Sequence, residues 1–161
     1  MAWHKANERY NGLINQLFHG NEWQERSEAA RELGIMKEGR AVNLLCRALR
    51  TEQDKVVQDR IIEALGKIGD GRATLRIIEK LKEMIDQDNI DKFRVINIIE
   101  SLINIKDKRA LVYIGPFLSI PEEDLRKVAE NAFDIIEPNW REIIKKERET
   151  KTIQDIFKIN I

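Results

Sequence analysis

Cysteine is nearly absent from this sequence, since its 161 residues include only Cys46. A single thiol cannot form a disulfide within the chain, which excludes the disulfide-stapled class of small secreted domains. The two histidines, His4 and His19, and this cysteine have no spacing typical of a structural zinc site. We therefore expect no metal, no other cofactor and no catalytic residue.

An excess of charge of either sign is also lacking. Lysine and arginine together number 28, as do aspartate and glutamate, so the formal net charge is zero. Phosphate backbones usually attract proteins with a basic excess, which disfavours nucleic acid as the partner. No stretch approaches the roughly 20 apolar residues of a membrane span. Because residues 1–5 have no apolar run typical of a signal peptide, we expect a soluble, cytoplasmic protein.

What the sequence does contain is an internal repeat. Leucine, alanine and leucine recur at matched positions, first with a step of 32 residues and then with a step of 37: Leu33, Ala41 and Leu49; Leu65, Ala73 and Leu81; Leu102, Ala110 and Leu118. We place the extra residues of the second step in a longer loop around residues 86–89. Self-similarity at such a period is typical of repeat architectures.

Each repeat is predicted to form two helices. The apolar residues of the second repeat follow the spacing of three and four that marks one helical face: Ile61, Ile62, Leu65 and Ile68, then Ala73, Ile77 and Leu81. A glycine-rich break at residues 69–71 separates the two helices. Neither helix can bury its apolar face alone, so stacked neighbours have to cover it.

The segment 64–73, Ala-Leu-Gly-Lys-Ile-Gly-Asp-Gly-Arg-Ala, resembles the HEAT-like repeat named after the phycobilisome lyases. The resemblance extends over residues 22–144. It implies an all-α fold, a short right-handed α-α superhelix of stacked antiparallel helix pairs. We expect one domain, with residues 1–20 as an N-terminal capping helix and residues 145–161 as a C-terminal tail. Lyase subunits, scaffolds and enzymes all occur in this family, so the fold alone does not determine function.

Related deoxyhypusine hydroxylases bind di-iron through His-Glu pairs. This sequence contains no such pair, which excludes that activity.

The last ten residues are predicted to begin a short helix at Thr152 with Ile156 and Phe157 on one face. A helix of that length is not stable in water by itself. We favour docking of this tail onto the last repeat as a cap, because a solenoid otherwise ends on an exposed apolar face. The alternative is docking onto another chain.

An acid-x-arginine element recurs where each second helix begins. Its members are Glu38 and Arg40 in the first repeat, Asp70 and Arg72 in the second, and Asp107 and Arg109 in the third. A carboxylate at a helix N-terminus accepts hydrogen bonds from free backbone N–H groups. We expect the arginine to reach an acid of the adjacent repeat, which would produce a structural ladder along the stack. Arg72 in particular should contact Asp70, Glu38 or Asp107, or a helix terminus beside it. A site for phosphate or an acidic peptide is the alternative.

The second helices are expected to line a concave face. We place the repeated alanines toward the core. Because each residue of a helix advances by about 100°, this placement determines which residues of the second helices face outward. The candidate partner-binding residues on or beside these positions are Arg47, Arg50, Arg76, Lys80, Tyr113 and Phe117. This face would be basic at one end and aromatic at the other, and arginine and aromatic residues are common interface anchors. The alternative is that Val112, Tyr113 and Phe117 pack under the C-terminal helices.

Taken together, these patterns indicate a non-catalytic module that binds a partner protein, for example an assembly factor or regulatory subunit. Cys46 is expected to be an inert core thiol. A subunit of a lyase-type enzyme, as in the bilin lyases, is the first alternative, and a HEAT-like DNA-binding protein is the second.

Overall fold

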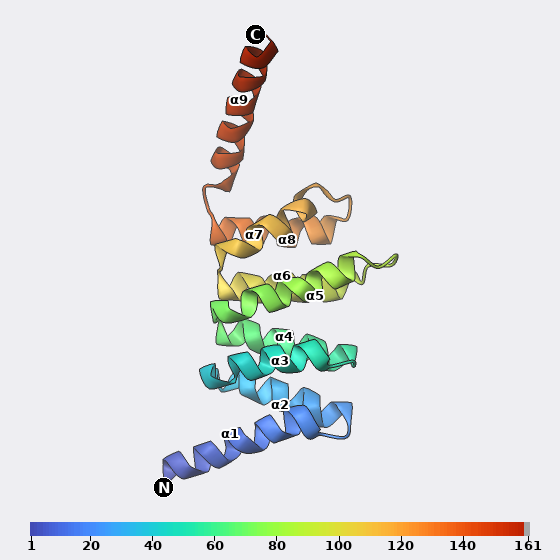
Figure 1. Ribbon diagram of the computed structural model, residues 1–161, viewed down its shortest axis with the longest axis vertical. Helices are drawn as coiled ribbons and strands as arrows, with labels where there is room; N and C mark the ends of the chain where they lie inside the picture. Colours follow the sequence, from blue (N-terminus) through green and yellow to red (C-terminus); the bar gives the residue numbers. More distant parts are fainter. Residues whose placement is uncertain (160–161) are drawn as a thin grey trace.

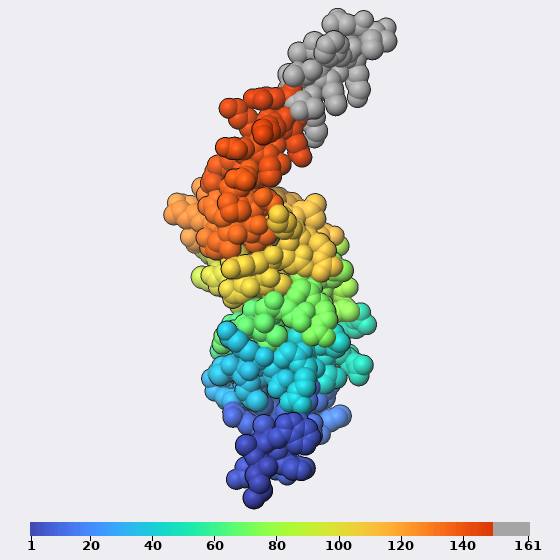
Figure 2. Space-filling model, turned by 90° about the vertical axis from the view of Figure 1, so that its left-hand side faces the viewer, coloured from blue at the N-terminus to red at the C-terminus, as the bar shows by residue number. Residues whose placement is uncertain are grey.

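Paired helices stacked along one axis make up the computed structural model, which describes the backbone of residues 1–159 and the side chains of residues 1–149 (Figure 1). No strand occurs among the described residues. The repeats follow one another along the long axis in the order of the sequence (Figure 2). The all-α solenoid predicted from the periodicity is therefore confirmed.

An N-terminal helix, α1 (Ala2–His19), packs on the first repeat. The helices of the repeats follow in pairs: α2 (Trp23–Ile35) with α3 (Val42–Thr51), α4 (Lys55–Ile68) with α5 (Thr74–Ile85), and α6 (Lys92–Ile105) with α7 (Leu111–Ile114). Short 3-10 turns precede each second helix, at η1 (Gly39–Ala41), η2 (Gly71–Ala73) and η3 (Lys108–Ala110). Next come η4 (Gly115–Ser119), α8 (Glu123–Ile136) and α9 (Trp140–Ile159). The longer loop expected between the second and third repeats lies between α5 and α6.

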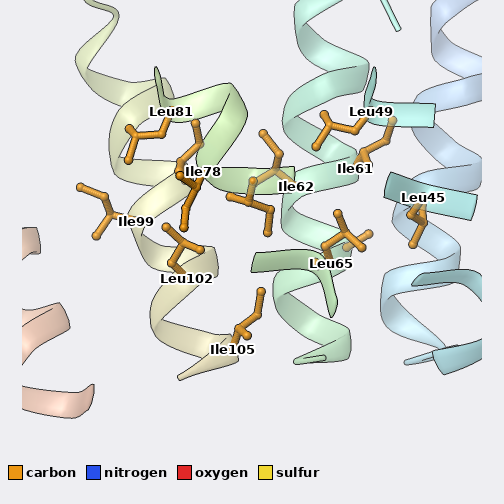
Figure 3. Close-up of a cluster of buried hydrophobic side chains, with 14 of the residues drawn as sticks. Leu45, Leu49, Ile61, Ile62, Leu65, Ile78, Leu81, Ile99, Leu102 and Ile105 are labelled. Carbon is orange, nitrogen blue, oxygen red and sulfur yellow. The ribbon is translucent and has the colours of Figure 1, made fainter. Parts of the chain in front are cut away.

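The matched positions of the repeat are buried in all three repeats except at Leu118, which is only partly buried where Leu49 and Leu81 are fully buried. Leu33, Leu65 and Leu102 are fully buried, and so are the three alanines at the start of the second helices. Aliphatic side chains from neighbouring repeats fill the space between the helices (Figure 3). One continuous hydrophobic core therefore runs through the stack, and burial of this apolar surface holds consecutive repeats together.

Glycines allow the first helices of consecutive repeats to approach closely. A Cβ atom on Gly34 would lie 2.7 Å from the Cα of Ala64, and one on Gly66 would lie 2.9 Å from the Cα of Ser101. Real side chains do not tolerate such distances, so α2 meets α4, and α4 meets α6, at positions where only glycine fits. The first helices form a closely packed row.

A residue in the left-handed backbone conformation follows the first helix in each of three repeats. Gly69 has a φ of 76°, and the residues at the same position of the neighbouring repeats, Lys37 and Lys106, have φ values of 48° and 60°. This conformation at the end of a helix lets the chain turn sharply into the next element. The turn is thus maintained in the two repeats that lack the glycine.

The second helix of the third repeat is much shorter than the sequence pattern predicted. It ends at Ile114 and continues as the 3-10 turn η4, which contains Pro116. Proline has no N–H to donate to the preceding turn, and its ring clashes with the backbone one turn earlier. The helix expected to extend to Leu118 is therefore interrupted.

The C-terminal helix begins earlier than predicted. α9 is continuous from Trp140 to Ile159, so Thr152 lies inside it and does not begin a separate helix. Trp140 packs on Phe133 of α8 with ring centroids 5.2 Å apart, and its Nε1 donates to Asp134 at 2.8 Å. From this first turn α9 leads away from the stack (Figure 1). The expected docking of Ile156 and Phe157 concerns side chains outside the described residues.

Candidate functional site

The outward positions predicted on the second helices are all exposed. They recur two, six and nine residues after the buried alanine of each repeat: Asn43, Arg47 and Arg50; Leu75, Glu79 and Lys82; Val112, Pro116 and Ser119. These positions lie on the side of each second helix that faces away from the core. The second helices therefore present one continuous surface, which we call the second-helix face.

A groove of about 440 Å³ opens on this face between α3 and α5. The residues that line it are Asn43, Cys46, Arg47, Arg50, Arg72, Leu75, Arg76 and Glu79. Three of the six candidate partner-binding residues, Arg47, Arg50 and Arg76, thus meet in one place. Four arginines and one glutamate line the groove, so it is basic although the whole chain has no net charge.

The arginines of the groove differ in how they are paired. Arg76 donates from Nη1 to Glu79, while its buried Nε has no hydrogen-bond partner among the described residues. Arg72 is held by Asp70 through an N–O contact of 2.8 Å. Arg47 and Arg50 are exposed and form no ion pair within the described part of the chain. Two full positive charges are therefore available at the mouth of the groove.

The other three candidate residues lie outside this groove. Phe117 is only 4% exposed and belongs to the core, so its predicted role as a contact residue is wrong. Lys80 is also largely buried, with 12% of its side chain exposed, and its Nζ contacts Glu83 at 2.9 Å. Both residues follow a buried alanine by seven positions, which is close to two helical turns, and so lie near the buried stripe.

Tyr113 is half-buried on α7. The Nζ of Lys82 lies 4.6 Å from the centroid of its ring, a cation–π contact that joins the second and third repeats. Val112, its neighbour in sequence, is 73% exposed. The alternative in which Val112, Tyr113 and Phe117 all pack under the C-terminal helices therefore holds for Phe117 and fails for Val112.

Cys46 lies in the wall of the groove and is partly buried. Burial raises the pKa of its thiol, and the nearby positive charge of Arg76 only partly opposes this effect. A thiol with a raised pKa is a poor nucleophile at neutral pH because little thiolate is present. The environment of Cys46 fits a packing role.

The acid-x-arginine elements form one of the predicted contacts, because Arg72 pairs with Asp70. In each, the carboxylate accepts a hydrogen bond from the backbone N–H of the arginine two residues later and pairs with its guanidinium. Arg72 also donates to the backbone carbonyl of Gly39 at 3.2 Å, and Arg109 donates to that of Gly71 at 3.0 Å. The arginine thus reaches the backbone of the preceding repeat, and the expected bond to an acid of the adjacent repeat is absent from these described elements.

The first element of this series joins the N-terminal helix to the first repeat. Arg40 donates to Asn7 Oδ1 at 2.8 Å, and its guanidinium lies 4.2 Å from the centroid of the Tyr10 ring. Glu38, the partner of Arg40, has a lowered pKa because the guanidinium donates hydrogen bonds to its carboxylate. α1 is therefore attached to the stack by polar contacts as well as by apolar packing.

Sequence reasoning missed a second groove, of about 580 Å³, between the first helices α4 and α6. Val56 and Phe93, which are 45% and 76% exposed, provide its apolar part. Beside them Arg94 pairs with Asp59 at 2.9 Å. The available signal was the apolar residue two positions after each helix-capping aspartate, because the first turn of a helix leaves such a residue exposed.

Within residues 1–149 no cluster of three or more histidine, cysteine, aspartate or glutamate side chains is arranged to hold a metal ion. Among the described helices, none is both long and apolar enough to cross a bilayer.

The repeated helix pairs have a counterpart among known families. The family described as HEAT repeats matches residues 10–96, which is more than half of the chain. The chain belongs to the HEAT-repeat family. HEAT repeats are helical modules of the kind that bind other proteins, and the stack of α2 to α8 has the paired architecture of such a module.

One curated relative is the bilin biosynthesis protein PecE of Mastigocladus laminosus. The two sequences are 34% identical over 93 residues, which cover 58% of this chain and 32% of PecE. The chain therefore matches about a third of the length of that protein.

Proposed function

We propose that this HEAT-repeat protein is a non-catalytic binding module that holds a partner protein on its second-helix face. The observation that supports this role is the basic groove, where Arg47 and Arg50 have no ion-pair partner within the described residues and Leu75 is 52% exposed beside them. Exposed arginine next to exposed aliphatic surface is a common composition of interface centres. A rigid stack presents such a surface with little loss of entropy on binding.

Affinity capture with a paired set of variants tests this proposal. The tagged full chain is compared with a Leu75→Glu, Val112→Glu variant, in which two exposed residues of the second-helix face become charged. The matched control is a Val56→Glu, Phe93→Glu variant, which adds the same charge to the first-helix groove. We expect a stoichiometric partner to be captured by the wild type and the control but lost by the second-helix variant. Loss of the partner with the control variant alone would indicate that the interface lies on the first helices.

A role in bilin biosynthesis is the second candidate, and the similarity to PecE is the observation that favours it. Titration of the protein with a free bilin, followed by visible absorption, tests this role directly. A saturable spectral change would support it. An unchanged spectrum at concentrations well above those used in the capture experiment would oppose it.

A further inference from the structure

We infer that the basic groove recognises an acidic segment of a partner protein in which carboxylates and aliphatic residues lie next to each other in the sequence. This inference rests on the proposed function and names the chemistry of the partner. Arg47 and Arg50 are the two arginines of the groove without an ion pair among the described residues, and a carboxylate is the group that a guanidinium binds in a paired, planar geometry.

The buried part of the groove strengthens the preference for an acceptor. The Nε of Arg76 is inaccessible to solvent and has no hydrogen-bond partner among the described residues, whereas its Nη1 donates to Glu79. A carboxylate that enters the groove would bring an acceptor beside this guanidinium. Glu79 is itself 54% exposed in its side chain, so it can move aside and leave the guanidinium of Arg76 to an incoming carboxylate.

The apolar part of the segment follows from the neighbouring positions. Leu75 lines the same groove, and Val112 occupies the matching position of the next repeat. Neighbouring helices lie about 8–10 Å apart, and a chain in the polyproline II conformation covers about 3.1 Å per residue and presents the same side every three residues. A segment that crosses the second helices would therefore place an aliphatic side chain on Leu75 and another on Val112 about three residues later, with its carboxylates at the Arg47 and Arg50 end.

The distribution of charge favours a protein segment over nucleic acid. Beyond the groove, the outward positions of the third repeat are Val112, Pro116 and Ser119, which carry no charge. Lys82, the cation closest to them in the repeat pattern, lies on the ring of Tyr113. A phosphate backbone needs a continuous series of cationic contacts to bind well at physiological salt. Here the unpaired arginines are confined to one end of the face.

Fluorescence anisotropy with synthetic probes tests the inference. The first probe is a fluorescein-labelled peptide with two adjacent glutamates followed by two leucines three residues apart, prepared also in the reverse order. The second probe replaces glutamate by glutamine, and the third is a single-stranded oligonucleotide of equal length. We expect one acidic peptide to bind the full-length protein about tenfold or more tightly than its glutamine version, because charge-assisted hydrogen bonds are then lost.

Two double variants with the same change in net charge complete the design. Arg47→Ala, Arg50→Ala removes the unpaired arginines, while Arg31→Ala, Arg60→Ala removes two exposed arginines of the first helices. The groove variant should lose the preference for glutamate over glutamine, and the control should keep it. Circular dichroism spectra of both variants serve as the check that they are folded.

Equal binding of the glutamate and glutamine peptides would overturn the inference, as would an equal loss in the control variant. Tighter binding of the oligonucleotide than of either acidic peptide would assign the groove to nucleic acid. If no peptide binds while affinity capture still depends on Leu75 and Val112, the acidic-segment inference is wrong and the proposed function stands. If capture also fails to depend on that face, both are wrong.

Discussion

At the scale of single residues, the ends of the first helices show how the repeat tolerates variation. Lys37, Gly69 and Lys106 occupy the same left-handed conformation at the same position of three repeats. Glycine adopts this conformation without a steric penalty, whereas a residue with a Cβ atom is strained in it by roughly 1–2 kcal/mol. Packing of the following helix onto the core therefore maintains the turn against a local preference.

Replacement of Lys106 by glycine is expected to stabilise the protein. Lys106 is exposed, so the change removes backbone strain without a loss of buried contacts. After allowance for the greater flexibility of glycine in the unfolded chain, the gain should be about 0.5–1 kcal/mol. Urea denaturation measures it, with Gly69→Ala as the reciprocal variant that should lose a similar amount. Destabilisation by Lys106→Gly would show that the lysine side chain contributes more than the strain costs.

A second residue-scale prediction concerns acid stability. The guanidinium of Arg109 lowers the pKa of Asp107 from 3.8 to about 2 in the folded protein. The unfolded chain then binds the proton more readily, so the contribution of this carboxylate to stability is complete above about pH 4 and is lost as the pH falls toward 2. Because Arg109 is 56% exposed in its side chain, the contribution should be only on the order of 1 kcal/mol.

Thermal unfolding of an Asp107→Asn variant measures this contribution. Asparagine keeps an oxygen that can accept the backbone N–H of Arg109 but carries no charge. The variant should be less stable than the wild type at neutral pH, and the difference should shrink at pH 2.5. A difference that stays constant between the two pH values would mean that the ion pair adds nothing.

At the scale of helices, close contact between the first helices distinguishes the two sides of the stack. A Cβ atom on Gly66 would clash with backbone of α6, whereas one on Gly12, within α1, would meet no atom within 4 Å. We expect Gly66→Ala to lower the free energy of unfolding by about 1–3 kcal/mol, since α4 and α6 must move apart.

Gly12→Ala is the matched control for this change and should raise the free energy of unfolding by about 0.5–1 kcal/mol, because alanine favours the helix. Chemical denaturation of both variants gives the comparison. Stabilisation by both substitutions would indicate that the first helices can separate at little cost.

The helices and their pairing could be predicted from the sequence because apolar spacing and turn residues are local signals. Pro116 is a local signal for the break after α7, but the repeat pattern by itself predicts a helix that continues across it. Phe117 is buried although the pattern predicts it beside the outward positions, because the chain leaves the α-helix at Ile114 and Phe117 lies in η4. The basic character of the groove between α3 and α5 could be predicted from Arg47, Arg50 and Arg76, but its width could not, since the width depends on how closely the helices of neighbouring repeats pack.

At the scale of the whole molecule, each repeat contacts only its neighbours, so stability should vary along the stack. α4 and α6 have repeats on both sides, whereas α1 has a neighbour on one side only (Figure 1). Amide hydrogen exchange followed by mass spectrometry should show the highest protection in α4 and α6 and lower protection in α1. Uniform protection over these helices would indicate that the array unfolds as a single unit.

The glycine contacts also make the two sides of the stack differ in stiffness. The first helices α2, α4 and α6 are already in close contact at their glycines, so the distance between them cannot decrease. The distance between α3 and α5 is set by the side chains of the groove, which can move. When the stack bends, the spacing of the first helices therefore stays nearly constant, and the distance between the second helices changes. A segment clamped between α3 and α5 would fix the curvature, and by linkage a force that changes the curvature would change the affinity for that segment.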